Sequence, residues 1–475
     1  MDDDARYRAL VARDARFDGV FFVGVTTTGI YCRPVCPART AGRARCVFFR
    51  RAAEAEHAGF RACFRCRPEL APGGAHVDAL STLARAAIAR IEAGALNEAS
   101  LDDLASELGV TARHLRRAVR AEIGVSPVEL AQTARLALAK QLLQDGATSM
   151  ADVAHASGFS SVRRFNAAFR ARFGRAPSTL PKRATGGAST RLVLGHRAPF
   201  PWRDILAFFA PRATPGVEAV DLDAGAYASA VRVGDRTGWI RATLDEPRRA
   251  LVVDVSPSLA RSLMAVASRV RALFDLDAQP HAIDAHLARD PALRALVRRT
   301  PGLRVPGAFD GFEMATRAVL GQQVTVRGAT TLAGRLARAF GETVESPHVE
   351  RTLPSAARLS RETPASIASI GLPAARAATL HALALAAARG DLVLDGTADP
   401  ATTLARLESI RGVGPWTAQY VAMRALRAPD AFPAGDLGLA RALGLAPRAL
   451  RERAVAWSPW RAYATLHLWR KDPKS

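Results

Sequence analysis

Hydrophobic positions near the C-terminal end of the chain repeat at the spacing of a helix and then stop at two glycines. Leu404, Leu407 and Ile410 fall on one helical face, which predicts that they face a core. Gly412 and Gly414 then break the pattern, and glycine at both positions predicts a tight turn with exposed backbone. A second helix should begin directly after them, because the next residue is a proline, which needs no backbone donor at the first helical position.

A helix, a two-glycine hairpin and a second helix together leave backbone N–H groups pointing outward at the start of the second helix. Such groups bind anions, and in a basic protein the expected anion is a DNA phosphate. Gly412 and Gly414 alone also fit a plain tight turn. Asp436, which follows the second helix in the segment Phe-Pro-Ala-Gly-Asp, adds a carboxylate and favours the DNA-binding interpretation.

Residues 78–183 contain two repeats of an amphipathic helix, a turn and a cationic helix. The first repeat has a helical segment at 101–109, and Thr111 is placed to cap a helix over 112–120. The second repeat begins at 149–158. Charged helices are often no more than solvated faces, but two such units favour helix-turn-helix motifs whose cationic helices enter the major groove. The arginines expected to contact DNA are Arg116, Arg117, Arg163 and Arg164.

Alternation typical of strands appears in two other parts of the chain. Residues 21–28 are apolar and then β-branched, which predicts one strand. Four further segments, separated by turn residues, predict a small antiparallel sheet: 191–194, 227–233, 239–244 and 250–255. From residue 258 to the end, the pattern is helical.

These elements predict an α+β multidomain protein that is mostly α-helical. Glycine-rich stretches at 71–75 and 184–189 read as linkers. The predicted domains are a small α/β domain at 1–76, an all-α double helix-turn-helix domain at 78–183, and a third domain at 190–475. The third divides into a sheet-rich subdomain, 190–280, and a helical bundle with the hairpin, 281–475.

Composition narrows the range of partners. The chain has 475 residues, a net charge of +22 and a pI near 11.1. Proteins this basic usually bind nucleic acid or an anionic membrane. An uninterrupted apolar run long enough to span a bilayer is absent from the sequence. Double-stranded DNA is therefore the expected partner, and a membrane partner is not expected.

Four of the five cysteines form two close pairs, Cys32 with Cys36 and Cys63 with Cys66. Two tight pairs of thiolates suit the tetrahedral coordination of one Zn²⁺, and paired cysteines in a cytosolic chain indicate a metal site before a disulfide. Cys46 stands apart and reads as a small buried residue. Seven arginines surround the pairs and could hold a DNA backbone and keep a sulfur anionic: Arg33, Arg39, Arg43, Arg45, Arg61, Arg65 and Arg67.

The runs Thr-Thr-Gly-Ile-Tyr-Cys-Arg-Pro-x-Cys at 27–36 and Gly-Phe-Arg-x-Cys-x-Arg-Cys-x-Pro at 59–68 resemble the N-terminal zinc domain of the Ada family. The resemblance implies that one zinc-bound cysteine accepts a methyl group from a methylphosphotriester. By position in the motif, that cysteine is Cys32. The alternative is a zinc site that serves only as a scaffold. Residues 78–183, through Gly-Phe-Ser-Ser at 158–161 and the phenylalanines that follow, resemble the AraC-type DNA-binding domain, in which a long helix, here 127–143, joins the two units.

The hairpin with Asp436, the segment Ala-Val-Leu-Gly-Gln-Gln-Val at 318–324 and the segment 457–469 resemble AlkA-type DNA glycosylases of the helix–hairpin–helix superfamily. The resemblance implies that Asp436 is the catalytic carboxylate and that a flipped base enters an aromatic pocket. The alternative for Asp436 is an N-cap of a helix that begins at Leu437, because aspartate is a good cap. The candidate pocket residues are Phe208, Trp416, Tyr420 and Trp469, each of which could equally be a core residue. The candidate DNA contacts are Gly412, Gly414, Thr417, Gln322 and Gln323.

Two positions refine this resemblance. Relatives that also act as lyases carry a Schiff-base lysine where this chain has Trp416, so a monofunctional enzyme that uses water is implied. Gln323 occupies the position of an apolar wedge in the family, and Gln322 could share that role.

The combined prediction is a bacterial alkylation-response protein that senses methylphosphotriesters, binds promoter DNA and excises alkylated bases of the 3-methyladenine class. A cysteine for a second methyltransferase domain is lacking after Cys66. The alternatives are a regulator with an inactive glycosylase-like domain, which the retention of Asp436 opposes, and a glycosylase/lyase for oxidised bases, which Trp416 opposes. The expected partners are alkylated and promoter DNA and RNA polymerase, and the expected state is a monomer in the cytoplasm, associated with the nucleoid.

Overall fold

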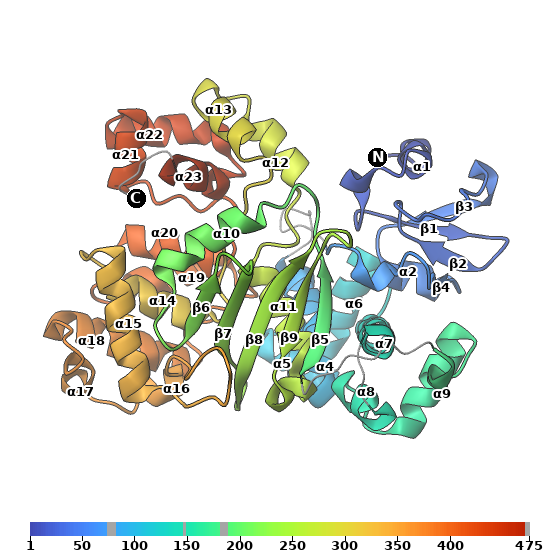
Figure 1. The fold of residues 1–475 in the computed structure, drawn as a ribbon, viewed down its shortest axis with the longest axis horizontal. Helices are drawn as coiled ribbons and strands as arrows, with labels where there is room; N and C mark the ends of the chain where they lie inside the picture. The colour runs from blue at the N-terminus through green and yellow to red at the C-terminus, as the bar shows by residue number, and fades with distance from the viewer. Residues whose placement is uncertain (74–81, 146–148, 181–188, 471–475) are drawn as a thin grey trace. The chain divides into compact units, whose positions relative to one another are not determined.

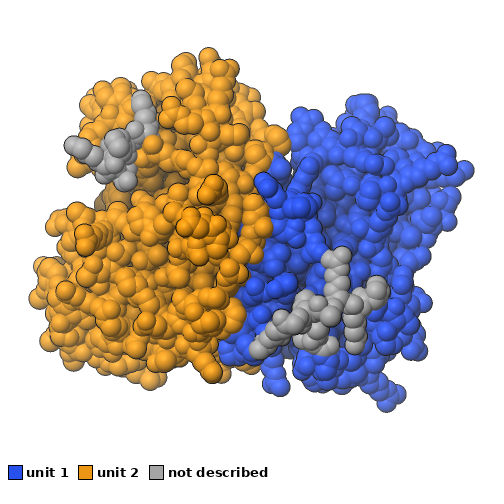
Figure 2. Space-filling model, in the orientation of Figure 1, with its two compact units in different colours: residues 1–198, 245–268 blue, residues 199–244, 269–475 orange. Residues whose placement is uncertain are grey.

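The computed structural model describes residues 1–73, 82–145, 149–180 and 189–470. The chain divides into two compact units, which Figure 2 shows in different colours. Unit 1 comprises residues 1–198 and 245–268, and unit 2 comprises residues 199–244 and 269–475.

Helices outnumber strands in both units (Figure 1), and this confirms the predicted fold class. The predicted linkers, 71–75 and 184–189, lie largely outside the described residues, and the domain boundaries stay predictions. Within the described ranges, every helix is too short or too polar to cross a membrane.

The N-terminal module, residues 1–73, is a small α/β structure built on a sheet with the strand order β3-β1-β2-β4. β2 and β4 run parallel, and their register pairs Ile30 with Arg61 and Tyr31 with Ala62. The next residues along the two strands are Cys32 and Cys63, so this register brings one cysteine of each pair side by side. The elements are α1 (Asp3–Val11), β1 (Phe22–Val25), β2 (Ile30–Cys32), β3 (Cys46–Phe49), α2 (Ala52–His57) and β4 (Arg61–Ala62).

The helical module, residues 82–180, has the two predicted helix-turn-helix units joined by a long helix. Caps fix the start of each cationic helix: the hydroxyl of Thr111 accepts from the His114 amide, and that of Ser161 accepts from the Arg164 amide. Phe165 is completely buried on the inner face of the second helix. The helices are α3 (Thr82–Glu92), α4 (Ala95–Glu98), α5 (Leu101–Glu107), α6 (Ala112–Ile123), α7 (Pro127–Asp145), α8 (Met150–Ala156) and α9 (Val162–Phe173).

A buried lysine on α7 joins the helical module to residues 63–69 of the N-terminal module, the cysteine segment. Lys140 is 0% exposed, and its Nζ atom donates to the backbone oxygen of Cys63 at 2.9 Å and to Glu69 at 2.8 Å. Arg67 donates to the Asp145 carboxylate through two hydrogen bonds of 3.0 and 2.6 Å. A charge can be buried only if it is paired and hydrogen-bonded. These pairs therefore fix the segment against α7.

Two further contacts tie the N-terminal module to the second cationic helix, α9. The ring of Phe64, which lies between two cysteines, is 5.7 Å from the ring of Phe173 and 4.1 Å from the Arg175 guanidinium carbon. Glu56 accepts a hydrogen bond from Tyr31 at 3.0 Å and forms an ion pair with Arg172. The cysteine segment and α9 consequently share one packed interior.

Two antiparallel strands complete unit 1: β5 (Thr190–Gly195) and β9 (Ala250–Val255). The Gln141 side chain of α7 donates to the backbone oxygen of Val193 in β5 at 2.9 Å. Both strands confirm segments predicted from the sequence.

Unit 2 combines three antiparallel strands with a helical bundle. Its strands are β6 (Glu218–Asp221), β7 (Ala226–Val233) and β8 (Arg236–Asp245). β6 and the helix α10 (Trp202–Phe209) were not predicted, because each is short and follows a proline-containing stretch that reads as a loop.

The helices of the bundle enclose one large core. Leu407 is buried within it, and Leu404 and Ile410 pack against its edge, as their spacing predicts. The helices are α12 (Pro280–Leu287), α13 (Pro291–Arg299), α14 (Gly311–Leu320), α15 (Val326–Phe340), α16 (Ala356–Leu359), α17 (Pro364–Ala368), α18 (Ala374–Ala388), α19 (Pro400–Ser409), α20 (Pro415–Arg424), α21 (Leu437–Leu443), α22 (Pro447–Ala454) and α23 (Arg461–Trp469), and α11 (Leu263–Leu273) leads into them.

Replacing Lys140 by methionine should destabilise unit 1 and leave unit 2 unchanged. The substitution keeps the volume but leaves Glu69 and the Cys63 carbonyl buried without their donor, at a cost of roughly 3–5 kcal/mol. All six tryptophans lie in unit 2, so tryptophan fluorescence follows unit 2 while zinc release during urea unfolding follows unit 1. We expect zinc release at lower urea and an unchanged fluorescence transition. The control is Arg113→Met, at an exposed position of α6. If Lys140→Met and Arg113→Met release zinc at the same urea concentration, the buried contacts of Lys140 do not stabilise unit 1 by the stated amount.

Candidate active site and metal centre

The predicted hairpin lies between α19 and α20, and its glycines have different reasons to be glycine. Gly412 has φ +92°, and a Cβ there would lie 2.2 Å from the hydroxyl oxygen of Thr379. The same hydroxyl donates to the backbone oxygen of Arg411 at 2.9 Å, which holds the hairpin against α18. Gly414 caps α20 in open space and provides no side-chain acceptor for the first amides of the helix, which begins at Pro415. These amides are available to an anion.

The loop after α14 is bound to this hairpin. Gln322 donates through Nε2 to the Gly412 backbone oxygen at 2.9 Å and to the Thr417 hydroxyl at 3.1 Å. Thr417 is 4% exposed, so it lies inside the fold and helps to hold Gln322 against the hairpin. Gln323 is exposed and has φ +56°, a conformation that a residue other than glycine adopts only under constraint. Of the two glutamines, Gln323 is the exposed one, and its contact with DNA stays a prediction.

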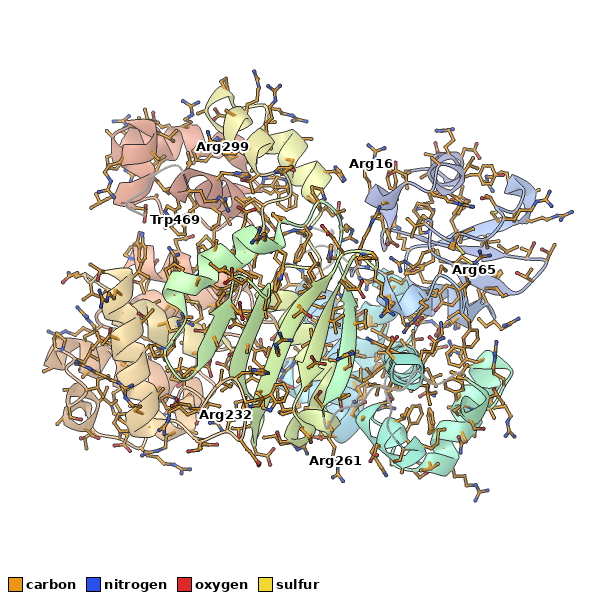
Figure 3. The ribbon with its side chains drawn as sticks, viewed as in Figure 1. Arg16, Arg65, Arg232, Arg261, Arg299 and Trp469 are labelled. Carbon is orange, nitrogen blue, oxygen red and sulfur yellow. The ribbon has the colours of Figure 1, made fainter. Side chains whose placement is uncertain are left out.

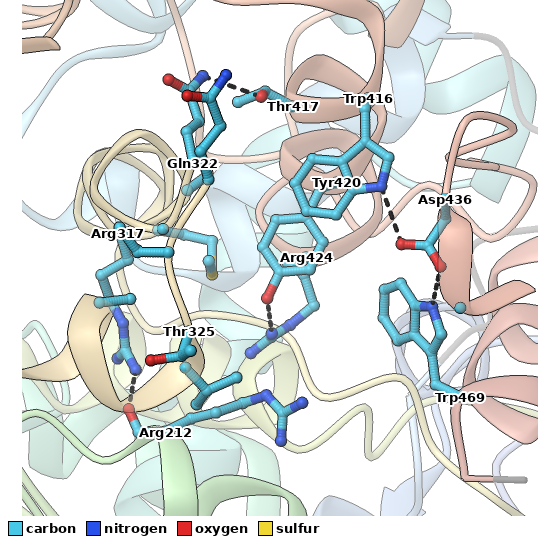
Figure 4. A pocket seen from close by; sticks show the side chains of 18 of the residues that line it. Arg212, Arg317, Gln322, Thr325, Trp416, Thr417, Tyr420, Arg424, Asp436 and Trp469 are labelled. Carbon is cyan, nitrogen blue, oxygen red and sulfur yellow. Dashed lines mark hydrogen bonds between the residues drawn. The ribbon is translucent and has the colours of Figure 1, made fainter. Parts of the chain in front are cut away.

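A pocket of about 710 Å³ opens beside the hairpin and collects the residues predicted for base binding (Figure 4). Phe208, Trp416, Tyr420, Trp469 and Asp436 all line it. Trp416 and Tyr420, one turn apart on α20, stack with ring centroids 5.2 Å apart and an interplanar angle of 8°. The structure therefore gathers side chains from α10, α20 and α23 around one cavity.

Asp436 is held at the edge of this pocket by donors from three segments. Oδ2 accepts from the Trp416 indole at 3.0 Å, and Oδ1 accepts from the Trp469 indole at 3.0 Å and from the Leu439 amide at 2.9 Å. The Leu439 bond is an N-cap of α21. The two sequence interpretations of Asp436, pocket carboxylate and N-cap, are therefore both true. Three donors therefore hold both oxygens of this carboxylate in fixed positions.

Three arginines at the pocket were not predicted. Arg317 on α14 forms an ion pair with Glu218 at 2.6 Å, and Arg424 on α20 donates to the hydroxyl of Tyr420 at 2.8 Å. The guanidinium of Arg212 lies 4.2 Å from the ring centroid of Phe208. Burial alone would raise the pKa of Tyr420, but these three guanidiniums hold that pKa below its usual value.

Only one sequence signal pointed to any of these arginines. Arg212 follows Phe208 by four residues, which is one helical turn, and the helix that would have exposed this relationship was not predicted.

The four predicted zinc ligands converge in the N-terminal module. The sulfurs of Cys32, Cys36, Cys63 and Cys66 all lie within 4.8 Å of one another. Zinc–sulfur bonds of about 2.3 Å in a tetrahedron place sulfurs roughly 3.8 Å apart, so this arrangement fits one Zn²⁺. Cys32 is partly exposed, whereas its three neighbours are buried. Cys46 is buried outside the cluster, as predicted.

Backbone amides stabilise negative charge on two of these sulfurs. The Arg33 amide lies 3.4 Å from the Cys66 sulfur, and the Arg65 amide lies 3.4 Å from the Cys63 sulfur. Arg65 itself is exposed between the ligands (Figure 3).

Two of the seven arginines around the cysteines are engaged by carboxylates of the fold, and contact of these arginines with DNA stays a prediction. Arg33 forms an ion pair with Asp18, and Arg67 pairs with Asp145 and Glu69. These two guanidiniums are partly buried and serve the fold, because their carboxylates already balance their charge.

Both cationic helices present exposed arginines at the predicted positions. Arg116 and Arg117 are exposed on α6, and Arg163 and Arg164 are exposed in the first turn of α9. At the other end of α9, Arg172 is engaged by Glu56. The groove-facing role of the four exposed arginines stays a prediction.

Comparison with known proteins agrees with this arrangement. Residues 5–69 match the metal binding domain of Ada, residues 104–183 a helix-turn-helix domain, and residues 191–310 the AlkA N-terminal domain. A Mycobacterium tuberculosis protein, probable bifunctional transcriptional activator/DNA repair enzyme AlkA, is 42% identical over 488 residues, covering 99% of this chain and 97% of the relative. Escherichia coli DNA-3-methyladenine glycosylase 2 is 35% identical over 278 residues, covering 58% of this chain and 96% of the relative.

Among solved structures, a 3-methyladenine DNA-glycosylase from Archaeoglobus fulgidus shares the fold. The TM-score is 0.53 at 22% identity, covering 59% of this chain and 98% of that one. The chain belongs to the family of bifunctional transcriptional activator/DNA repair proteins that combine an Ada-type zinc domain, an AraC-type helix-turn-helix domain and an AlkA-type DNA glycosylase.

Proposed function

We propose that this protein senses methylphosphotriesters in DNA by methyl transfer to Cys32, binds promoter DNA through its helical module, and hydrolyses the N-glycosidic bond of alkylated bases of the 3-methyladenine class. The single observation that carries the enzymatic part is the Asp436 carboxylate, held by two indoles at the edge of a pocket lined by aromatic rings. It favours a DNA-3-methyladenine glycosylase over a regulator with an inactive third domain.

Base excision at this pocket would begin with a flipped base stacking among Phe208, Trp416, Tyr420 and Trp469. As the bond from C1′ of the sugar to the base nitrogen breaks, the electron pair leaves with the base and positive charge develops on the sugar. The carboxylate of Asp436 stabilises that charge and orients the water whose oxygen bonds to C1′. One proton of that water is released, and the sugar is left as an abasic site.

The hairpin and the adjoining loop would hold the DNA during this reaction. The free amides at the start of α20 and the backbone around Gly412 and Gly414 suit a phosphate. Gln323 is the candidate to fill the gap in the base stack, while Gln322 and Thr417 keep the hairpin in place.

A lyase reaction is disfavoured by the side chains at the pocket. The position of the Schiff-base lysine is filled by Trp416, whose indole is committed to Asp436. Lysine is absent from the side chains that line the cavity within the described part of unit 2. The enzyme would therefore be monofunctional, in contrast to a glycosylase/lyase for oxidised bases.

Methyl transfer would occur at the exposed edge of the cysteine cluster. Bound zinc keeps the four sulfurs as thiolates. The Cys32 sulfur attacks the methyl carbon, a sulfur–carbon bond forms, and the methyl–oxygen bond breaks, so the phosphotriester becomes an ordinary phosphodiester. Cys32 is suited to this role because it is the partly exposed member of the cluster.

The regulatory part of the function rests on the helical module. Exposed arginines on α6 and α9 would enter successive major grooves of promoter DNA, and an activator bound there would contact RNA polymerase. We propose that the protein acts as a monomer on the chromosome, in the cytoplasm and associated with the nucleoid.

The substitution Asp436→Asn should abolish base release and leave the fold intact. Asparagine is as good an N-cap as aspartate, so the expected loss of stability is below roughly 1 kcal/mol, whereas loss of the charge should slow release by roughly 10²-fold or more. The measurement is release of 3-methyladenine and 7-methylguanine from alkylated DNA, with DNA binding followed in parallel.

Asp290→Asn is a matched control for this experiment. Asp290 also caps a helix and accepts from an indole, that of Trp457 at 2.7 Å, but it lies outside the pocket. Its substitution should lower stability without slowing release. Near-normal release by Asp436→Asn would refute the assignment of the catalytic carboxylate.

Transfer of a labelled methyl group should modify Cys32 alone. We expect about one zinc per chain, one S-methylcysteine at Cys32 by peptide mass spectrometry, and no transfer to Cys32→Ser. Cys46→Ser should transfer normally because its sulfur lies outside the cluster. Label on Cys46, or no label on a zinc-replete protein, would mean that the zinc site is only a scaffold.

Removal of Arg163 and Arg164 together should weaken promoter binding and flatten its salt dependence. Each lost phosphate contact should reduce the slope of log affinity against log salt by roughly 0.9. The paired control is Arg203→Ala with Arg289→Ala, which removes the same charge from exposed positions of unit 2. An unchanged footprint and slope in the Arg163/Arg164 variant would show that α9 does not read DNA.

A further inference from the structure

The base pocket is electrically asymmetric. At one edge lies the Asp436 carboxylate with its two indoles, and at another lie the guanidiniums of Arg212 and Arg424. In the view of Figure 4, Tyr420 and Arg424 lie between Arg212 and Asp436. Asp436 is placed for the sugar, where positive charge develops. A cationic wall elsewhere in the same cavity is therefore placed for the base.

Arg317 has a carboxylate among its described contacts, whereas Arg212 and Arg424 do not, and Arg424 differs from Arg212 in donating to three protein acceptors. Arg317 is neutralised by Glu218 at 2.6 Å. Arg424 donates to the carbonyls of Pro306 and Gly307 and to Tyr420.

The described contacts of Arg212 contain no carboxylate. It donates to the Phe208 backbone oxygen at 3.1 Å, and its guanidinium carbon lies 4.2 Å from the Phe208 ring centroid. Burial lowers the pKa of this guanidinium from a value so high that the group stays charged at neutral pH. Arg212 thus brings an unneutralised positive charge to the cavity.

We propose that Arg212 is a specificity-determining residue that favours excision of damaged purines that are neutral in DNA over those that are cationic. This inference rests on the proposed glycosylase function. When the glycosidic bond breaks, the electron pair stays on the base nitrogen, so a cationic alkylpurine leaves as a neutral base and a neutral purine leaves as an anion.

A fixed guanidinium affects the two classes of base in opposite directions. It stabilises the negative charge that develops on a neutral base in the transition state, which speeds its departure. A cationic base is repelled as it enters the pocket and keeps part of its positive charge in the transition state, so the guanidinium lowers its rate of release when that rate is counted from free enzyme and free DNA. The aromatic rings act in the other sense, because their electron-rich faces attract a cationic base. The ratio between release of neutral bases and release of cationic bases thus depends on the opposing effects of Arg212 and the aromatic rings.

The test uses the full-length protein and two duplex oligonucleotides, one carrying a single hypoxanthine, which is neutral, and one carrying a single 7-methylguanine, which is cationic. Single-turnover release is measured at subsaturating enzyme, so that the rate is counted from free enzyme and free DNA, for the natural protein, Arg212→Met and Arg212→Lys. Methionine keeps an apolar chain over Phe208 without the charge, and lysine restores the charge. Arg203→Met, at an exposed position of the preceding helix α10, is the matched control.

We expect Arg212→Met to release hypoxanthine roughly 10²-fold more slowly, the order of effect seen when one preorganised donor is removed, and to release 7-methylguanine at least as fast as the natural protein. Arg212→Lys should recover most of the hypoxanthine activity, and Arg203→Met should change neither. The ratio of the two rates is the decisive quantity, because misfolding or a misplaced Phe208 lowers both together.

Equal loss on both substrates, or no loss on either, would overturn the role of Arg212. A natural protein that releases 7-methylguanine but not hypoxanthine would also overturn it while leaving the proposed function in place. A natural protein that releases neither base would remove the proposed function itself.

Discussion

The chemistry of unit 2 depends on how one carboxylate is held. Asp436 is fixed by the indoles of Trp416 and Trp469 and by the amide of Leu439. These donors come from three segments, so the hairpin, the loop before α21 and the last helix must all be in place before the site exists. A carboxylate beside an aromatic pocket is unfavourable unless it is hydrogen-bonded. The same indole N–H groups that solve this problem also orient the rings that line the cavity, and the carboxylate and the aromatic wall of the cavity are consequently one structure.

Sequence patterns predicted the parts of this site that depend on local geometry. The two glycines, the proline that begins α20 and the pocket aromatics were all expected, and Asp436 was recognised in both of its roles, although as alternatives. The arginines of the pocket could not be predicted in the same way. Arg424 occupies an ordinary helical position, and only tertiary packing directs it to the carbonyls of Pro306 and Gly307. Arg212 depends on α10, a short helix without a side-chain cap bond, so little in the local sequence marks its beginning.

In unit 1 as well, local features could be predicted from the sequence, whereas contacts between distant residues could not. Thr111 predicts the start of its helix, because a hydroxyl accepting from an amide three residues later is a local interaction, and Ser149 and Ser161 cap two further helices in the same way. The ion pairs between the modules are not local: Arg67 and Asp145 lie 78 positions apart. Charge counting suggested that the arginines around the cysteines would all serve DNA, and it could not separate those that already have a buried carboxylate. A net charge of +22 indicates the class of partner, whereas individual contacts decide which arginines are left to bind it.

The cysteine segment of the N-terminal module has to satisfy two sets of neighbours at once. Cys63 and Cys66 contribute their sulfurs to the metal centre, while the residues between and after them turn toward the helical module. Phe64 packs on Phe173, and the carbonyl of Cys63 accepts from the buried Lys140. A ligand pair separated by two residues leaves little freedom in the backbone between them, so the position of the sulfurs and the position of that carbonyl are set together. The cysteine cluster and the second helix-turn-helix unit thus both depend on a single short segment, and a substitution chosen to alter one must be checked for its effect on the other.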